Sequence, residues 1–323
     1  MFDVPILYIV FNRPEETKRS FEVFRKLKPA KLYISADGPR NHRPDDIENT
    51  EKVKQIVSQV DWECEVKTLY HAANRGCRGA VEKALEWFFE QEKEGIIIED
   101  DIIPNGAFFE FSKRMLQKYR DDDSIFSING CSIGYQNANE PYGITRYFNM
   151  WGWATWRRTY QLVQHTWKDF NPGDALKDDK TTRKVLHLPV SFDSNKKWLQ
   201  HWQQIFTDTY NGKIDTWDHQ WVYTAFKLDK YCIRPAQNYI VNIGFGETAT
   251  HHTFTKSPIC NLKYTADNWQ DPPLHQPVVD YKYEVEYVGK MVNSVELTTW
   301  WQRIFSLVPA PIKKAVKKMI VRG

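Results

Sequence analysis

Short apolar runs alternate with amphipathic stretches over the first 130 residues. The runs of strand length are residues 5–11, 31–37, 65–70, 96–98 and 124–128. The stretches with apolar side chains at helical spacing are residues 14–27, 79–90 and 107–119. Unbroken apolar runs are typical of strands that are covered on both faces of a parallel sheet. The alternation therefore predicts an α/β fold with a mostly parallel central sheet and helices on both faces.

The apolar run at 96–98 leads directly into three acids, Glu99, Asp100 and Asp101, which we call the acidic triplet. Burying unpaired carboxylates in the core would cost several kcal/mol, so we expect them in the crevice beyond the strand ends. Carboxylate oxygens suit Mn²⁺ or Mg²⁺, with substrate phosphates completing the coordination. This segment alone is equally consistent with a metal–diphosphate site and with a strand that turns into an acidic loop.

Two other predicted strands also end on polar residues. Asn12 and Arg13 follow the first strand, and Asp37 ends the second. The carboxyl ends of parallel strands lie along one edge of a sheet, so these side chains should meet the acidic triplet there. This convergence favours the metal–nucleotide site over the acidic loop.

Composition narrows the classes of protein. The net charge of +3 over 323 residues is too small to indicate a nucleic-acid partner. Five scattered cysteines without metal-like spacing are typical of reduced thiols in a cytoplasmic protein. No secretory signal precedes the first predicted strand, and no apolar stretch approaches the roughly 20 residues of a membrane span. The aromatic content of 15% fits either a sugar-binding cavity or additional core.

Six motifs occur in order along the chain. They are FNRP at 11–14, ISADGP at 34–39, IIIEDDIIP at 96–104, WGWATWR at 151–157, WDHQW through CIRP at 217–235, and NIGFGETATHH at 242–252. Together they resemble GT-A fold glycosyltransferases, in particular bacterial nucleotide-diphospho-sugar transferases related to the N-acetylglucosaminyltransferase that initiates complex N-glycans. The resemblance implies a GT-A domain over residues 1–255, with a nucleotide-sugar-binding half (1–130) and an acceptor-side half (131–255). Residues 256–323 would form a C-terminal extension.

The resemblance also implies roles for single residues. Asp101 would be the ligand of Mn²⁺ or Mg²⁺, while Asp100 and Glu99 would contact the ribose or the donor sugar. Asp37 matches the acid that reads the base, typically uracil, and Arg13 matches an arginine near the diphosphate. The further donor contacts expected from the family are Asn12, Arg78, Trp153 and the loop histidine His251, which cannot be separated from His252 by alignment.

Asp218 matches the catalytic base of an inverting enzyme, which takes the proton of the acceptor hydroxyl. The family motif is Trp-Asp-Asp-Trp, whereas this chain has Trp217-Asp218-His219-Gln220-Trp221. His219 is therefore an alternative base. Asp218 could also serve only as a helix N-cap, a position that favours aspartate.

These roles imply a metal-dependent inverting glycosyltransferase that moves a sugar, from UDP in the typical case, to a hydroxyl of a glycan or lipid-linked acceptor during bacterial surface polysaccharide synthesis. A sugar nucleotidylyltransferase is an alternative, but Asn12-Arg13-Pro14 differs from the glycine-rich phosphate loop of that class. A non-catalytic sugar- or nucleotide-binding protein is a second alternative, and it would not require Asp218.

Two other charged segments have simpler interpretations. Asp45 and Asp46 fall in a stretch rich in Pro, Arg and Asn, so we expect them in a surface loop. Residues 303–323 carry six basic side chains and no acid, interleaved with apolar residues. Such a segment predicts either peripheral contact with the inner face of the plasma membrane or a terminal helix docked on the domain.

Overall fold

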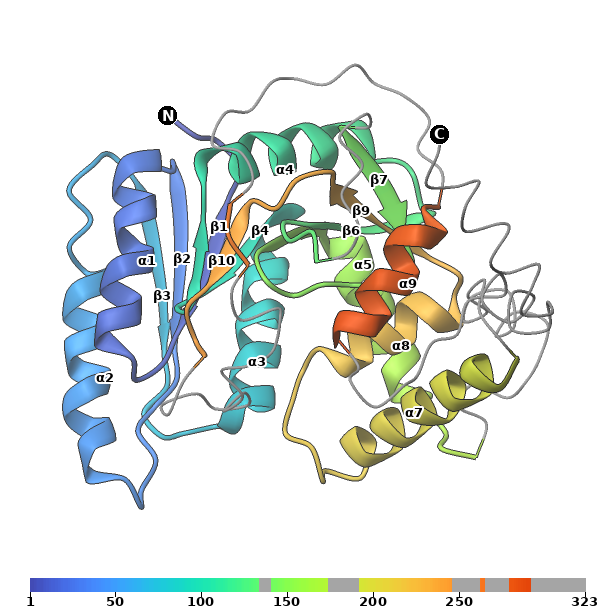
Figure 1. Ribbon diagram of the computed structural model, residues 1–323. Helices are drawn as coiled ribbons and strands as arrows, with labels where there is room; N and C mark the ends of the chain where they lie inside the picture. Colours follow the sequence, from blue (N-terminus) through green and yellow to red (C-terminus); the bar gives the residue numbers. More distant parts are fainter. Residues whose placement is uncertain (134–140, 174–191, 246–261, 265–278, 292–323) are drawn as a thin grey trace, which may run out of the picture.

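The computed structural model describes residues 1–133, 141–173, 192–245, 262–264 and 279–291. Its centre is an eight-stranded sheet in the order β3-β2-β1-β4-β8-β6-β9-β7 (Figure 1). The strands of this sheet are β1 (Ile6–Val10), β2 (Lys31–Ala36), β3 (Glu65–Tyr70), β4 (Glu94–Glu99), β6 (Ile125–Asn129), β7 (Tyr142–Thr145), β8 (Trp153–Trp156) and β9 (Tyr231–Pro235). A separate two-stranded sheet pairs β5 (Ile102–Pro104) with β10 (Ile240–Asn242).

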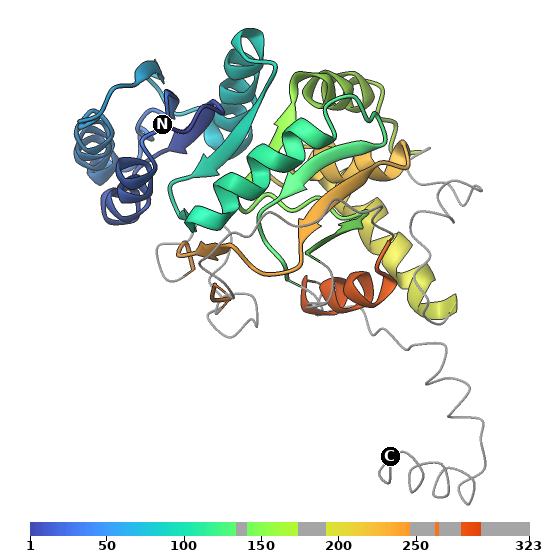
Figure 2. The same ribbon diagram turned by 90° about the horizontal axis from the view of Figure 1, so that it is seen from above.

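Helices surround the central sheet. They are α1 (Pro14–Leu27), α2 (Pro44–Val57), α3 (Gly76–Gln91), α4 (Gly106–Lys118), α5 (Arg157–Lys168), α7 (Phe192–Tyr210), α8 (His219–Lys227) and α9 (Tyr281–Met291). Figure 2 shows α1 and α2 at one end of the molecule and α7 and α9 at the opposite end. No helix in the described ranges is both long and apolar enough to cross a bilayer.

The strand directions confirm the predicted fold class. β1 runs parallel to both β2 and β4, β2 is parallel to β3, and β6 is parallel to β9. Only β8 and β7 run antiparallel to their neighbours. The three strands that were expected to end on polar residues, β1, β2 and β4, are therefore adjacent and end at the same edge.

Two tyrosines show that helices cover both faces of this sheet. Tyr8 of β1 contacts Phe24 of α1, with 4.8 Å between the ring centroids. Tyr33 of β2 contacts Phe88 of α3 at 5.0 Å. Tyr33 lies opposite Leu7 in the parallel register, and neighbouring residues of a strand point to opposite faces. Tyr8 and Tyr33 therefore point in opposite directions, and α1 and α3 cover opposite faces.

The expectation for Asp45 and Asp46 was wrong as to the loop and, for Asp46, as to exposure, whereas Asp45 is exposed as expected. Both acids belong to the first turn of α2 rather than to a surface loop, and Asp46 is fully buried. Its carboxylate accepts hydrogen bonds from Arg40 Nε and from Asn12 Nδ2, each at 2.6 Å. The buried face of α2 includes Asp46 and a threonine beside two valines, so no apolar periodicity marked this helix in the sequence.

The domain boundaries and the behaviour of the C-terminal segment remain predictions. The eight-stranded sheet runs continuously through strands from both predicted halves of the chain. The basic segment 303–323 lies outside the described residues, as does the loop histidine His251.

Candidate functional site

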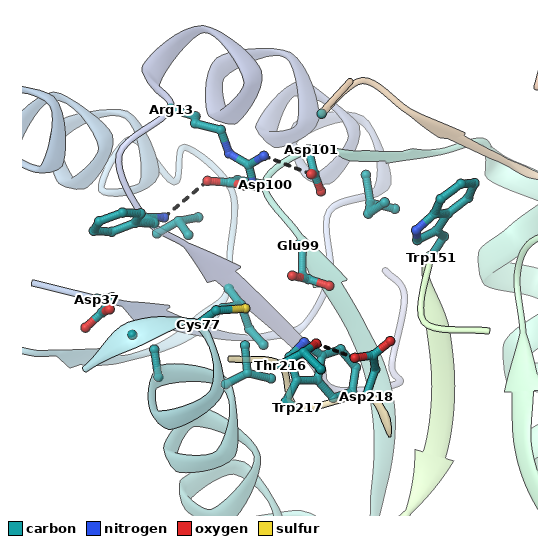
Figure 3. Close-up of a pocket in the computed structure, with 18 of the residues that line it drawn as sticks. Arg13, Asp37, Cys77, Glu99, Asp100, Asp101, Trp151, Thr216, Trp217 and Asp218 are labelled. Atoms are coloured by element: carbon teal, nitrogen blue, oxygen red, sulfur yellow. Dashed lines mark hydrogen bonds and ion pairs between the residues drawn. The ribbon is translucent and has the colours of Figure 1, made fainter. Parts of the chain in front are cut away.

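A cavity of about 440 Å³ opens at the carboxyl ends of β1, β2 and β4 (Figure 3). The acidic triplet and Arg13 line one side of it, and Asp37 lines the end of β2. The segment Ile214–His219, which leads into α8, contributes the facing side. The cavity therefore collects charged side chains from segments that are more than 200 residues apart in the sequence.

Arg13 bridges two acids of the triplet. Its Nη1 donates to Asp101 Oδ2 at 2.9 Å, and its Nη2 donates to Asp100 Oδ1. The backbone N–H of Phe11 donates to the other Asp100 oxygen at 3.1 Å, and the Ser20 hydroxyl donates to the Asp100 backbone carbonyl at 2.9 Å. Asp100 is thus held from both sides by residues that follow β1.

The pKa values at this edge reflect burial and crowded charge. Burial raises the pKa of the Glu99 carboxyl well above its usual range, and the nearby Asp101 adds to the effect. Burial also raises the pKa of Asp100, although Arg13 opposes that shift. Burial disfavours the charged form of Arg13, but Asp100 and Asp101 outweigh it and raise the guanidinium pKa. The site therefore holds three carboxyl groups and one nearby cationic side chain, that of Arg13.

This donor set fits a divalent cation. The Asp101 side chain is 17% exposed whereas that of Asp100 is 2% exposed, so Asp101 is the more accessible ligand. Among the described residues, no three acid, histidine or cysteine side chains form a complete cation cage. One or two carboxylates with phosphate oxygens supplying the rest is the usual arrangement for Mg²⁺. The excess negative charge and the accessible Asp101 carboxylate match that arrangement.

Asp37 organises the loop that closes the cavity at the end of β2. Its carboxylate accepts backbone hydrogen bonds from Gly38 at 2.8 Å and from Arg75 at 3.0 Å, and a side-chain bond from Asn74 at 2.8 Å. Burial raises the pKa of Asp37, and the bonds from Arg75 and Gly38 oppose this shift. Gly38 is required because a Cβ there would lie 2.5 Å from the Ala73 carbonyl carbon.

Asp218 faces the triplet across the cavity. Figure 3 shows Arg13, Asp100 and Asp101 together on one side, Asp218 with Thr216 on the other, and Glu99 between them. Asp218 occupies the N-cap position of α8, yet its side chain makes no capping hydrogen bond there. The carboxylate instead accepts a bond from the Thr216 hydroxyl. The alternative base His219 also lines the cavity, with its Nδ1 2.7 Å from Thr209 Oγ1.

Three of the expected donor contacts, Asn12, Arg78 and Trp153, lie away from the cavity lining. Asn12 donates to the buried Asp46 rather than pointing into the cavity. Arg78 lies on α3, where its Nε pairs with Glu82 at 2.8 Å. Asn12 therefore joins two neighbouring segments, while Arg78 pairs within its own helix.

The two tryptophans of the WGW motif are placed differently. Trp153 is fully buried in β8 and stacks on Trp217, with 5.7 Å between the ring centroids. Trp151 lines the cavity, and its ring contacts Phe245 at 5.5 Å. Gly152 adopts a φ of +61°, which a glycine tolerates and which lets the chain turn between the two rings.

Several cavity residues were not expected from the sequence. The Arg40 guanidinium lies 5.2 Å from the Phe11 ring centroid, and both residues line the cavity. Cys77 also lines it; burial raises the pKa of its thiol, as do Glu99 and other nearby acids, so the thiol stays neutral. Phe11 is the last residue of the first predicted strand, which was an available signal. No local pattern marks Arg40 or Cys77.

Comparisons with known proteins identify no family. No protein-family model matches the chain, and no curated protein sequence matches it. Among solved structures, it is similar to mouse xyloside xylosyltransferase 1, with 9% identity, a TM-score of 0.32, and 70% of this chain and 82% of that one covered.

Two further solved structures show likeness of the same order. HddC from Yersinia pseudotuberculosis has 11% identity and a TM-score of 0.31, with 49% of this chain and 78% of that one covered. A UDP-glucose pyrophosphorylase complexed with UDP-glucose has 7% identity and a TM-score of 0.29, with 50% and 80% covered. Scores this low do not assign an activity.

Proposed function

We propose that this chain is a metal-dependent inverting glycosyltransferase. It would move a sugar from a nucleoside-diphosphate donor, typically UDP, to a hydroxyl group of a glycan or lipid-linked acceptor. We further propose bacterial surface polysaccharide synthesis as the setting, which rests on the resemblance of the six motifs alone.

One observation carries the proposal: a carboxylate, Asp218, faces the acidic triplet across a single cavity. Sugar transfer needs positive charge where the diphosphate leaves and a proton acceptor where the hydroxyl attacks. A cation on Asp101 would supply Lewis-acid stabilisation of the leaving diphosphate. Direct displacement by a hydroxyl that one base deprotonates inverts the configuration of the sugar. Asp218 alone would supply that base.

The side chains of the chain itself account for the remaining steps. Arg13 offers a fixed guanidinium beside the triplet, where it can donate to phosphate oxygens. Asp218 takes the proton of the acceptor hydroxyl, and the Thr216 hydroxyl orients the carboxylate by donating to one oxygen. The second oxygen of Asp218 then remains for the acceptor proton.

The decisive experiment compares wild type with Asp218→Asn, with Mn²⁺ and a panel of nucleotide sugars. The asparagine oxygen can still accept the Thr216 hydroxyl bond, so the fold should be kept. Loss of the base should lower turnover by about 10²–10⁴-fold. Release of nucleoside diphosphate with the sugar appearing on water or acceptor is the readout, and thermal melting reports folding.

The exposed Asp121→Asn is the matched control and should keep full activity. His219→Gln tests the alternative base. If His219 is the base, turnover should fall in this variant and should be kept in Asp218→Asn. Pyrophosphorolysis of the nucleotide sugar, in which labelled pyrophosphate enters the nucleoside triphosphate and sugar 1-phosphate is released, would instead establish a nucleotidylyltransferase. Binding of nucleotide sugar without turnover, unchanged in Asp218→Asn, would indicate a non-catalytic binding protein.

A further inference from the structure

We infer that Asp215 is a positioning residue that holds the loop of the catalytic base against helix α3. The inference rests on the proposed function of Asp218. Asp215 precedes Asp218 by three residues and has no place among the motifs of the sequence. It acts on the reaction by fixing where the Asp218 carboxylate stands relative to the acidic triplet.

Asn74 Oδ1 accepts the first N–H of helix α3, that of Gly76, at 3.2 Å, and Asp215 caps the next two. The N-cap residue of α3, Arg75, makes no side-chain capping bond. Asp215 Oδ2 accepts the backbone N–H of Cys77 at 3.1 Å, and Oδ1 accepts that of Arg78 at 3.2 Å. These N–H groups belong to the first turn of the helix, which ordinarily receives its cap from the preceding residue. Here a carboxylate 137 and 138 residues away takes that role.

Gly76 allows this close approach. It has a φ of +76°, and a Cβ at this position would lie 2.9 Å from Asp215 Oδ2. A side chain there would both strain the backbone and displace the carboxylate. The start of α3 is therefore shaped to receive Asp215.

A second attachment lies on the other side of Asp218. Gln220, buried in the first turn of α8, donates through Nε2 to Glu82 Oε1 of α3 at 2.6 Å. Asp218 therefore lies between two contacts with the same helix. Helix α3 continues into β4, which carries the acidic triplet at its end. The separation of base and triplet is thus set through α3, with Asp215 as the attachment nearest the cavity.

The test is Asp215→Ala, with Asp215→Asn as a second variant that keeps one acceptor oxygen. A small displacement of a catalytic group can cost about 100-fold in rate, so kcat should fall by roughly 10- to 100-fold in Asp215→Ala. Asp215→Asn should lie between wild type and alanine. The KM for the nucleotide sugar should stay within about twofold, because the triplet and Arg13 are untouched. In the Asp218→Asn background, Asp215→Ala should cause no further loss.

The matched control is Asp122→Ala. Asp122 also accepts a backbone N–H, from Ser124 at 2.9 Å, but it lies outside the cavity lining. This variant should leave kcat unchanged. If Asp215 is merely structural, Asp215→Ala would lower the melting temperature and leave kcat unchanged, or it would reduce turnover by the same factor in the wild-type and Asp218→Asn backgrounds. Either outcome overturns the inference.

Amide hydrogen exchange tests the loop attachment independently of the proposed function. Asp215→Ala should increase exchange in peptides that cover 76–80 and 214–221, whether or not the protein transfers sugar. If wild type transfers no sugar while exchange responds in this way, the proposed function fails and the loop attachment stands. Unchanged exchange in both peptides would show that Asp215 does not hold the loop.

Discussion

Asp46 shows how a residue outside the cavity can shape it. Its buried carboxylate joins Asn12, at the end of β1, to Arg40, in the segment after β2. Arg40 in turn lies over the Phe11 ring at the cavity wall. One carboxylate therefore holds both segments in place without facing the ligand.

This residue predicts a specific loss of stability in acid. The hydrogen bond from Arg40, with the further bond from Asn12, lowers the pKa of Asp46 to about 2 from its ordinary 3.8. A carboxyl whose pKa is lower in the folded state stabilises the fold above the unfolded pKa and loses that contribution as the pH falls. We therefore expect about 2 kcal/mol of unfolding free energy to disappear between pH 4 and pH 2.

Urea unfolding at a series of pH values measures this contribution. Asp46→Asn should be less stable than wild type at pH 7 and should lose less stability on acidification. Asp45→Asn, which changes the exposed neighbouring acid, should follow the wild-type curve. An acid response of Asp46→Asn equal to that of wild type would contradict the assignment.

At the scale of elements, β4 is the strand on which the site depends. It is paired on both sides, with β1 and β8, and its three isoleucines are buried. Gly95 of β4 lies directly beneath α3. A Cβ at Gly95 would stand 2.3 Å from Phe88 Cζ and 2.8 Å from the Pro5 carbonyl oxygen. The helix and the strand can pack this closely only over a glycine.

Gly95→Ala should therefore destabilise the protein. Overpacking of this kind costs about 1–3 kcal/mol, and the backbone oxygen of Pro5 cannot move aside as a flexible side-chain end would. Gly106→Ala is the matched control because no atom lies within 4 Å of its added Cβ and because alanine favours the helix that begins there. Unfolding free energies from urea titration should separate the two variants, and equal stability would refute the packing argument.

The sequence predicted those elements whose buried face is apolar. β1 was expected at 5–11 and occupies Ile6–Val10, where every residue is buried, and the helix expected to start at Pro14 does so. α2 was missed because half of its buried residues are polar. α3 begins three residues before the expected Gly79, because its first turn is capped by Asp215 from a distant loop. Such long-range contacts leave no local signal.

At the scale of the whole molecule, helix α9 is the last element along the chain that the structure describes. A buried ion pair attaches it to the rest of the fold. Glu284 of α9 pairs with Arg146, which follows β7, and both side chains are almost completely buried. Glu284 also accepts the Arg146 backbone N–H at 2.7 Å. A second pair joins Asp280 to Arg234 of β9 at 2.8 Å. The segment 279–291 is thus an integral part of the fold.

Glu284→Ala should leave the buried Arg146 guanidinium without its carboxylate. Breaking one half of a buried ion pair costs about 3–5 kcal/mol. Glu286→Ala, on the same helix but partly exposed, is the control and should cost far less. Thermal or urea unfolding of both variants measures the difference, and a Glu284→Ala protein as stable as the control would contradict the expectation.

Much of the candidate site was visible in the sequence because it follows strand ends. Arg13, Asp37 and the acidic triplet lie at or just after the ends of β1, β2 and β4, and the structure places them around one cavity. Asp218 was expected from the motif and lines the facing side. Asp215, by contrast, depends on a contact between distant segments that only the folded chain reveals. The chemical roles of all these residues remain proposals.

The bridge made by Arg13 has a consequence for which ligands this cavity favours. The guanidinium acts as an internal counter-ion, so the chain neutralises part of its own acidic edge. A bare cation would have to compete with that guanidinium for Asp101. A ligand that brings phosphates together with a cation offers Arg13 new oxygens in exchange for the carboxylate. We therefore expect the cavity to bind a pair of opposite charges that arrive together more tightly than a lone ion.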